Sequence, residues 1–309
     1  MAEIKAWFEK YRPSTACEYI FKNEALKQQV SKWIEVKDIS GHLLLAGPAG
    51  TGKTSLAKVL MNDMEVEEAD RLYVNASRDN GVELFRDKIK MFAETMPWGD
   101  YKVVLLDEAD YLTQPGQAIF RGVMEEYASS VRFIMTCNRP NLIIPAIHSR
   151  SQVIYLDQMD ENEFAVRLAE ILIAEDREFE IDTLDLFVRA NYPDLRKAIN
   201  SIQLNSASGK LGLPDESESG SDWKLQMIAL FREGKYTEAR KTIVANVRPD
   251  EYVDIYRFLY KNLEFYGDSD DVQDGAILSI RNGLVKHSQC ADPEINLSAT
   301  LIELEQLVK

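Results

Sequence analysis

Residues 47–54 read Gly47-Pro48-Ala49-Gly50-Thr51-Gly52-Lys53-Thr54, a complete G-x-x-x-x-G-K-[ST] phosphate loop. The apolar run 43–46 before it has the character of a buried strand, and residues 55–60 after it have the character of a helix. In such a loop the glycines let backbone N–H groups surround phosphates, the lysine neutralises them and the last hydroxyl ligates Mg²⁺. The alternative is a glycine-rich turn that happens to contain a lysine. Such a turn would not require a strand before it or a helix after it. The stretch therefore predicts an α/β fold that binds a nucleoside triphosphate.

Residues 102–110, Lys-Val-Val-Leu-Leu-Asp-Glu-Ala-Asp, are predicted to form a second buried strand that ends on carboxylates. We expect Asp107 to hold Mg²⁺ together with Thr54, through water. Glu108 is placed to polarise the water that attacks the phosphate. A strand that ends in solvated acids is the alternative. The letters Asp-Glu-Ala-Asp also occur in a helicase family, whose first motif and second motor domain are not visible in this chain.

Two further polar residues are expected near the phosphates. The strand 131–138 ends in Asn138, which can hydrogen-bond the γ-phosphate or the attacking water. Arg150 precedes the apolar run 153–156, where ring-forming motors carry an arginine that enters the site of a neighbouring subunit. A surface arginine in a salt bridge is the alternative for Arg150. The predicted catalytic set is Lys53, Thr54, Asp107, Glu108, Asn138 and Arg150.

The order of these motifs resembles that of the AAA+ sliding-clamp loaders. The motifs that carry the resemblance are Lys10-Tyr11-Arg12-Pro13, the phosphate loop, Asn75-Ala76-Ser77, Asp107-Glu108-Ala109-Asp110, Thr136-Cys137-Asn138, Ser149-Arg150 and Pro193-Asp194-Leu195-Arg196. They are similar to those of replication factor C small subunits, while the length and the divergent C-terminal third resemble the clamp-loader large (ATPase) subunit of T-even-like phages. The resemblance covers about residues 8–205.

The resemblance implies an α/β AAA+ phosphate-loop module, a small helical lid and a C-terminal all-helical collar domain. Residues 1–157 would form the RecA-like ATPase domain. Residues 158–212 read as three amphipathic helices and would form the lid. The acidic stretch 213–222 is rich in Pro, Gly and Ser and predicts a linker. Residues 223–309 read as helices without legible chemistry, and the resemblance implies that they form the collar that joins subunits.

Further nucleotide contacts follow from the resemblance. Residues at the start of the chain would line the adenine end, where a planar ring and a branched aliphatic side chain can pack against a purine. Arg196 matches the second sensor, which reaches from the lid to the phosphates. The complete predicted cofactor-binding set is Glu9, Lys10, Tyr11, Arg12, Ile20, Gly50, Thr51, Gly52, Lys53, Thr54, Ser55 and Arg196.

A basic helix is predicted to begin near Gly81, since the apolar positions 82, 85, 89 and 92 have helical spacing. A solvated basic face is the alternative to a DNA contact. The resemblance places this helix, and the next one at 113–125, against DNA. There Gln117 and Arg121 would share a face and couple the nucleotide site to DNA. The predicted DNA-binding residues are Asn80, Arg86, Lys90 and Arg121, of which Asn80 stands where cellular relatives commonly carry arginine.

The large side chains of Met91, Met96, Pro97 and Trp98 follow the basic helix. We interpret them either as a tip that docks on the clamp or as ordinary core packing.

Composition constrains the class of protein. The net charge of −15 is uneven, because residues 1–156 carry 19 basic and 21 acidic side chains while residues 157–309 carry 17 and 30. A local basic surface on the first part can therefore still contact phosphates, because salt screens fields beyond about 8–10 Å. No secretory leader or run of 18 apolar residues is visible, so we expect a cytoplasmic protein, in host cytoplasm if it is of phage origin, without a membrane partner.

Together these features predict an ATP hydrolase, stimulated by DNA and clamp, that serves as the motor subunit of a sliding-clamp loader in DNA replication, viral if of phage origin. ATP binding would open the clamp and admit primer–template DNA, and hydrolysis would release the clamp on DNA. The cofactors would be ATP and Mg²⁺. The partners would be homologous copies and a distinct small subunit in a ring-like pentamer. Another AAA+ DNA machine, such as a helicase loader or branch-migration motor, and a non-hydrolysing ATP-gated scaffold remain as alternatives.

Overall fold

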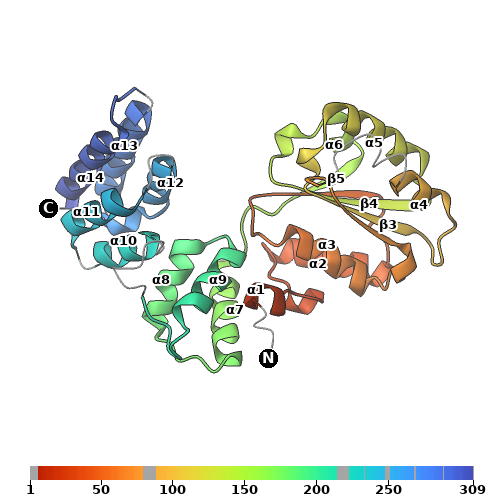
Figure 1. The fold of residues 1–309 in the computed structure, drawn as a ribbon, viewed down its shortest axis with the longest axis horizontal. Helices are drawn as coiled ribbons and strands as arrows, with labels where there is room; N and C mark the ends of the chain where they lie inside the picture. The colour runs from red at the N-terminus through yellow and green to blue at the C-terminus, as the bar shows by residue number, and fades with distance from the viewer. Residues whose placement is uncertain are drawn as a thin grey trace. The chain divides into compact units, whose positions relative to one another are not determined.

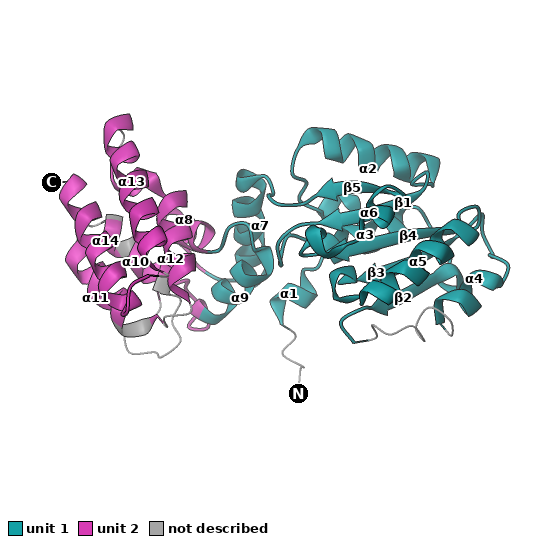
Figure 2. Cartoon of the chain, turned by 90° about the horizontal axis from the view of Figure 1, so that it is seen from above, with its two compact units in different colours: residues 1–177, 191–204 teal, residues 178–190, 205–309 magenta. Residues whose placement is uncertain are grey.

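The computed structural model describes residues 6–78, 88–213, 223–232, 234–247, 251–267, 269–287 and 289–308. The chain divides into two compact units, shown in different colours in Figure 2. Unit 1 comprises residues 1–177 and 191–204, and unit 2 comprises residues 178–190 and 205–309. The predicted linker 213–222 lies outside the described residues except for Leu213.

Unit 1 contains a five-stranded sheet in which every pair of neighbouring strands is parallel. The strands, in chain order, are β1 (His42–Ala46), β2 (Arg71–Asn75), β3 (Lys102–Asp107), β4 (Val131–Cys137) and β5 (Ser151–Tyr155). Their spatial order is β2-β3-β4-β1-β5. The α/β class predicted from the phosphate loop is confirmed. Since all strands run the same way, their carboxyl ends meet at one edge, where ligands bind in such sheets.

Apolar residues alternate between the two faces of the sheet, so each face has its own core. On β1, Leu44 and Ala46 belong to one cluster and Leu43 and Leu45 to the other. Figure 1 shows α5 and α6 over one face and α2 and α3 over the opposite face. The central strands are buried on both sides, which explains the continuous apolar runs in their sequences.

The helices of unit 1 are α1 (Trp7–Lys10), α2 (Glu24–Val36), α3 (Lys53–Asp63), α4 (Met91–Glu94), α5 (Gln114–Glu126), α6 (Pro145–His148), α7 (Glu161–Ala174) and α9 (Leu195–Asn205). Among them, α5, α7 and α9 begin and end near the predicted boundaries, whereas α1 and α2 were not predicted. Side-chain caps fix several starts. The side chain of Thr113 accepts a hydrogen bond from the N–H of Gly116, and that of Asp160 accepts one from the N–H of Glu163.

On α5 the two residues predicted to couple the nucleotide site to DNA differ in burial, and the coupling stays a prediction. Gln117 is buried, accepts a hydrogen bond from the N–H of Ile144 at 2.8 Å and donates one to the carbonyl of Leu142 at 3.0 Å, whereas Arg121 is exposed. The two residues therefore share no exposed face, although they are four positions apart. Gln117 fastens α5 to the segment before α6 rather than reaching outward.

The segment that precedes β3 also differs from its prediction in part. Residues 79–87, which hold Asn80, Arg86 and most of the predicted basic helix, lie outside the described residues. Beyond them Ile89 is buried as expected, and α4 is short. Core packing is wrong for Met91, Met96 and Trp98, whose exposed fractions are 64%, 87% and 84%.

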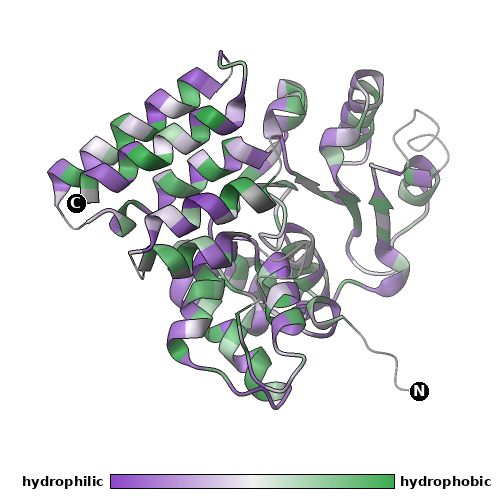
Figure 3. Cartoon of the chain, turned by 60° about the vertical axis from the view of Figure 1, so that its left-hand side comes forward, coloured by the Kyte–Doolittle hydropathy of each residue, from purple (hydrophilic) through white to green (hydrophobic). Residues whose placement is uncertain are grey.

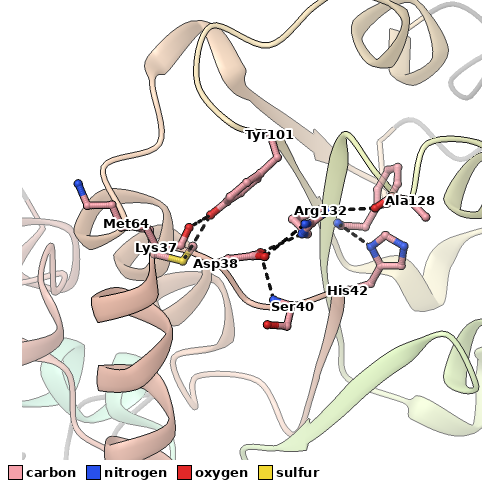
Figure 4. A network of polar contacts seen from close by, with 9 residues as sticks. Lys37, Asp38, Ser40, His42, Met64, Tyr101, Ala128 and Arg132 are labelled. Carbon is pink, nitrogen blue, oxygen red and sulfur yellow. Dashed lines mark hydrogen bonds and ion pairs between the residues drawn. The ribbon is translucent and has the colours of Figure 1, made fainter.

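A polar network lies at the amino ends of the strands (Figure 4). Arg132, near the start of β4, donates hydrogen bonds to the carboxylate of Asp38 at 2.9 and 3.3 Å and lies over the ring of Tyr101. His42, at the start of β1, accepts a hydrogen bond from the N–H of Phe133 at 3.2 Å. Burial alone would raise the pKa of Asp38, but the hydrogen bonds from Arg132 and from Ser40 lower it. Burial is also the main cause of a raised pKa of about 12 for Tyr101.

In its described part, unit 2 consists of helices joined by loops, with one isolated β-bridge between Glu178 and Lys210. Its helices are α8 (Ile181–Asn191), α10 (Trp223–Arg232), α11 (Tyr236–Asn246), α12 (Tyr252–Lys261), α13 (Asp270–His287) and α14 (Pro293–Val308). Apolar and polar stretches alternate along its helices in Figure 3, as amphipathic packing requires. Among the described residues, no helix has the length and apolar character needed to cross a membrane. The helical region after the module is confirmed, and the boundaries of lid and collar stay a prediction.

Candidate functional site: a pocket at the carboxyl end of the sheet

The phosphate loop connects β1 to α3 and encloses one side of a pocket of about 330 Å³. Its shape depends on glycine. Gly50 and Gly52 have φ values of 78° and 81°, and a Cβ on Gly50 would lie 1.8 Å from the Oδ1 of Asp194. The hydroxyl of Thr51 is used inside the loop, where it donates to the carbonyl of Pro48 at 2.9 Å. Thr51 is buried and does not line the pocket as the described residues define it, whereas Gly50, Gly52 and Ser55 do.

Lys53, the first residue of α3, is 8% exposed. Its ammonium group donates hydrogen bonds to the carbonyl oxygens of Gly47, at 2.8 Å, and Pro48. Burial is the main cause of the lowered pKa of Lys53, and the nearby charge of Arg196 lowers it further. Because a buried cation without an opposite charge is costly, this ammonium group favours an anionic ligand.

Asp107, at the end of β3, accepts hydrogen bonds from three hydroxyls. Thr54 donates to Oδ1 at 2.8 Å, Thr136 also donates to Oδ1, and Tyr73 donates to Oδ2 at 2.9 Å. Burial is the main cause of the raised pKa of Tyr73, so its hydroxyl keeps the proton that it donates. Hard oxygen donors of this kind suit Mg²⁺. The Thr54 hydroxyl and the Asp107 carboxylate thus fit the predicted metal site.

Glu108 follows Asp107 in a left-handed backbone conformation, with φ of 57°. Its N–H donates to the hydroxyl of Thr136 at 2.9 Å, so Thr136 contacts both acidic residues. A left-handed conformation is uncommon outside glycine and is held only where the surroundings enforce it. Glu108 lines the same pocket as Lys53.

Asn138 follows β4 and also lines the pocket. Its N–H donates to the buried carboxylate of Asp110 at 3.3 Å, and the Nε of Arg139 donates to the same carboxylate at 3.3 Å. Asp110 therefore connects the loop after β3 to the loop after β4. No role was predicted from the sequence motifs for Asp110, Thr136 or Tyr73.

The start of the chain supplies the apolar end of the pocket. Of the predicted base-contacting residues, Tyr11, Arg12 and Ile20 line it. The structure does not bring Glu9 or Lys10 to that lining. Glu9 forms an ion pair with Arg12 at 2.7 Å, and Lys10 forms one with Glu175 at 2.6 Å.

Glu175 also accepts a hydrogen bond from the hydroxyl of Tyr11 at 2.8 Å. Glu9 and Lys10 therefore do not line the pocket as the described residues define it, and their contact with the base stays a prediction. Both side chains hold the arm that carries Tyr11.

Residues 191–204 belong to unit 1 and complete the pocket. Arg196, the predicted second sensor, lines the pocket with its guanidinium 5.9 Å from the ring centre of Phe8. Asp194 caps the same helix by accepting a hydrogen bond from the N–H of Lys197 at 2.9 Å. The helix that carries Arg196 therefore begins beside the phosphate loop, at the contact between Asp194 and Gly50.

Comparison with known proteins agrees with this site. A model of the ATPase family associated with various cellular activities (AAA) matches residues 43–158. The replication factor C small subunit of Haloarcula marismortui is 31% identical over 98% of this chain and 95% of its own length. That of Saccharolobus solfataricus is 36% identical over 76% of this chain and 73% of its own. The chain belongs to the replication factor C small-subunit family of AAA ATPases. It is thus a clamp-loader type of ATPase that binds ATP.

The solved structures that are similar show the fold alone. The Holliday junction branch migration motor RuvB of Thermotoga maritima has a TM-score of 0.57 and 17% identity, covering 80% of both chains. The curated relatives reported above are archaeal, so they give no support to a phage origin or to a viral role.

Arg150, which is predicted to act in trans, lies just before β5. It does not line the pocket of its own chain, as far as the described residues define that pocket. Its guanidinium forms an ion pair with Glu125 and donates to the carbonyl of Ala146 at 2.8 Å. Of the predicted DNA contacts, Arg121 is exposed, while Lys90 lies within 4.0 Å of Glu94 and 3.8 Å of Glu126.

Proposed function

We propose that the chain hydrolyses Mg²⁺–ATP as the motor subunit of a sliding-clamp loader, in a ring-like pentamer with homologous copies and a distinct small subunit. The observation that carries the proposal is the convergence of Lys53, Asp107, Glu108 and Asn138 on one pocket, in a chain 31% identical to a replication factor C small subunit along 98% of its length. ATP binding would hold an open clamp and primer–template DNA. Hydrolysis would release the clamp on DNA.

The residues in cis have separate tasks in this proposal. Lys53 binds the β- and γ-phosphates, exchanging the two loop carbonyls for phosphate oxygens. Thr54 and Asp107 hold the magnesium ion and its water shell. When bound, the ion would offset negative charge that develops on the phosphate during hydrolysis.

The remaining steps concern the attacking water. Glu108 accepts a hydrogen bond from the water and orients it toward the γ-phosphorus, and Asn138 holds the water or a γ-oxygen. Arg196 supplies a second positive charge from the helix that caps the pocket. Because the transition state is mostly dissociative, positioning and charge account for most of the rate.

Arg150 is proposed to act in the site of a neighbouring subunit. Its absence from the lining of its own pocket, within the described residues, supports that role, and its ion pair with Glu125 would hold it ready at the surface. An arginine supplied in trans contributes on the order of 10³–10⁵ in rate.

Subunit mixing tests this role. A wild-type subunit that lends its arginine should restore turnover in the site of an Arg150→Ala subunit, whereas it should not restore a Lys53→Ala subunit. An Arg150→Ala defect that stays the same with and without wild-type partners would contradict a role in trans.

The exposed side chains of Met91, Met96 and Trp98 are proposed to dock on the clamp. Two buried charges brace this loop. Lys102 donates to the carbonyl of Phe92 at 2.7 Å, and Asp70 accepts hydrogen bonds from the N–H groups of Trp98 and Gly99 at 2.9 and 2.8 Å. A rigid, exposed apolar tip loses little conformational freedom when it binds.

The tip also gives the test that separates a clamp loader from another AAA+ DNA machine. Trp98→Ala should weaken binding to a purified ring clamp about tenfold or more while the intrinsic ATPase rate stays within twofold. Tyr155→Ala, an exposed aromatic on β5, is the matched control. Failure of the wild-type complex to bind any ring clamp would favour a helicase loader or a branch-migration motor. A complex that binds the clamp without turnover would favour a scaffold.

DNA contact is proposed for Arg86, Lys90, Arg121 and Asn80. Arg86→Glu should lower DNA-stimulated ATPase activity and spare the basal rate, because the residue would contact phosphates and not the nucleotide. Because the variant releases fewer counterions than wild type, its loss of DNA affinity should shrink as salt rises. Filter binding to primer–template DNA that is unchanged at every salt concentration would contradict the proposal.

A further inference from the structure

The hydroxyl of Tyr73 reaches the acidic centre of the pocket from an edge strand of the sheet. Tyr73 lies on β2 opposite Leu105 of β3, and its hydroxyl donates to the Oδ2 of Asp107 at 2.9 Å. The ring lines the nucleotide pocket, and the ammonium group of Lys58 lies 5.5 Å from its centre. The ring is about half exposed, so the core does not require an aromatic side chain at this position.

The two oxygens of Asp107 are held differently. Oδ1 accepts hydrogen bonds from Thr54 and Thr136, and Oδ2 accepts one from Tyr73. A threonine hydroxyl ligates a metal through an oxygen lone pair and keeps its proton, so Thr54 can bind the cation and still donate to Oδ1. Among the described residues, Tyr73 supplies the one hydrogen bond to Oδ2, while the two threonines both donate to Oδ1. That arrangement fixes the rotation of the carboxylate about its Cβ–Cγ bond.

We propose that Tyr73 is a positioning residue that orients Asp107 toward the water shell of the nucleotide-bound cation. The proposal rests on the Mg²⁺–ATP site proposed above and adds to it a hydroxyl that none of the motifs contains. The tyrosine acts through Asp107 and does not touch the reacting atoms. Its contribution is to affinity for the cation, so it should be overcome by raising the concentration of that cation.

Tyr73→Phe tests the proposal because it removes one oxygen and keeps the ring. Tyr127→Phe is the matched control, since the hydroxyl of Tyr127 also donates to a carboxylate, that of Glu126 at 3.1 Å, but does not line the pocket. Binding of a fluorescent, slowly hydrolysed ATP analogue is titrated with Mg²⁺ in the full chain. Mn²⁺ binding is followed by electron paramagnetic resonance, and thermal unfolding is recorded for each variant.

The expected result is a half-saturating Mg²⁺ concentration about three- to tenfold higher in Tyr73→Phe, as the loss of one hydrogen bond of ordinary net strength implies. Mn²⁺ affinity should fall by a similar factor. ATP turnover should recover to within twofold of wild type at saturating Mg²⁺, and Tyr127→Phe should match wild type throughout.

Equal Mg²⁺ and Mn²⁺ affinities in Tyr73→Phe and wild type would overturn the inference, whether or not the melting temperature changes. A turnover defect that high Mg²⁺ does not relieve would overturn it as well. Nucleotide binding that is independent of Mg²⁺ in wild type and both variants would overturn the proposed metal site itself. The two failures are therefore distinguishable.

Discussion

The two ends of the parallel sheet in unit 1 carry similar side chains in opposite circumstances. At the amino end, Asp38 and Arg132 form a half-buried ion pair at 2.9 Å. At the carboxyl end, Lys53 donates to backbone carbonyls and Asp107 accepts from hydroxyls. Among the described residues, the ammonium group of Lys53 forms no ion pair within 4.0 Å, although it is the more deeply buried cation.

The difference distinguishes a ligand-binding site from an ion pair that stabilises the fold, within the same sheet. Charges that neutralise each other are satisfied within the fold, and removing one partner leaves the other stranded. Charges held by neutral hydroxyls and carbonyls can exchange those partners for a ligand at small net cost. We therefore expect variants at the carboxyl end to change binding and turnover, and variants at the amino end to change stability.

The largest expected effect is that of Glu108→Gln on turnover. The amide cannot accept the proton or orient water as a carboxylate does, so the ATPase rate should fall about 10²–10⁴-fold. Nucleotide affinity should stay within twofold, because the phosphate loop and Asp107 are intact. Glu161→Gln, an exposed position on α7, is the control. An equal loss of affinity and rate in Glu108→Gln would contradict the separate role of this residue.

Lys53→Ala should weaken Mg²⁺–ATP binding about 100-fold, or about 2.7 kcal/mol, because the triphosphate loses its buried cation. Equilibrium fluorescence titration measures the change, with Lys32→Ala, an exposed position on α2, as control. The unfolding transition should not move down, since burial disfavours the charged lysine in the fold. A strong loss of stability would show that Lys53 stabilises the fold, as Arg132 does, and would contradict a role in binding alone.

Arg132→Leu should do the reverse. Loss of its hydrogen bonds to Asp38 and its contact with Tyr101 should lower the free energy of unfolding by about 2–3 kcal/mol in urea titrations. ATP affinity should not change. Arg257→Leu breaks an exposed arginine–aspartate pair, with Asp254, and should cost about 0–1 kcal/mol. An equal loss of unfolding free energy in the two variants would show that the network in Figure 4 does not stabilise the fold more than an exposed ion pair does.

The smallest effect expected is a pH dependence from His42. Burial lowers the pKa of His42 below 6.5, so the unfolded chain binds the proton more readily than the folded one. Stability from this group is complete above about pH 6.5 and is lost as pH falls toward the folded pKa, with a slope of at most about 1.4 kcal/mol per pH unit. Urea unfolding of wild type and His42→Asn between pH 5 and about pH 7.5 measures the slope. Identical slopes would contradict the assignment.

The parts of the fold and of the site that could be predicted from the sequence are those formed by single continuous segments of the chain. The run 43–54 contains its own strand, loop and helix start, and the run 102–108 contains a strand and its terminal acids. Parallel strands bring such ends together, so Lys53, Asp107 and Glu108 share a pocket. The roles of these residues stay predictions until turnover is measured.

The contacts and exposed side chains that could not be predicted from the sequence depend on strand register and on burial. Tyr73 reaches Asp107 because β2 pairs with β3 in a particular register, which no local pattern in 71–75 shows. Gln117 is buried, and its side chain accepts a hydrogen bond from the N–H of Ile144, which is distant in the sequence. Trp98 is exposed because the buried carboxylate of Asp70 holds its backbone, and spacing alone does not distinguish that arrangement from a core tryptophan.

Calorimetric titration of Mg²⁺ and a slowly hydrolysed ATP analogue into wild type, Lys53→Ala and Arg132→Leu tests the contrast between the two ends most directly. It is run well below the unfolding temperature of each variant. The account predicts the same affinity for wild type and Arg132→Leu and little measurable heat for Lys53→Ala. Binding by Lys53→Ala as tight as that of wild type, or its loss in a folded Arg132→Leu, would contradict the account.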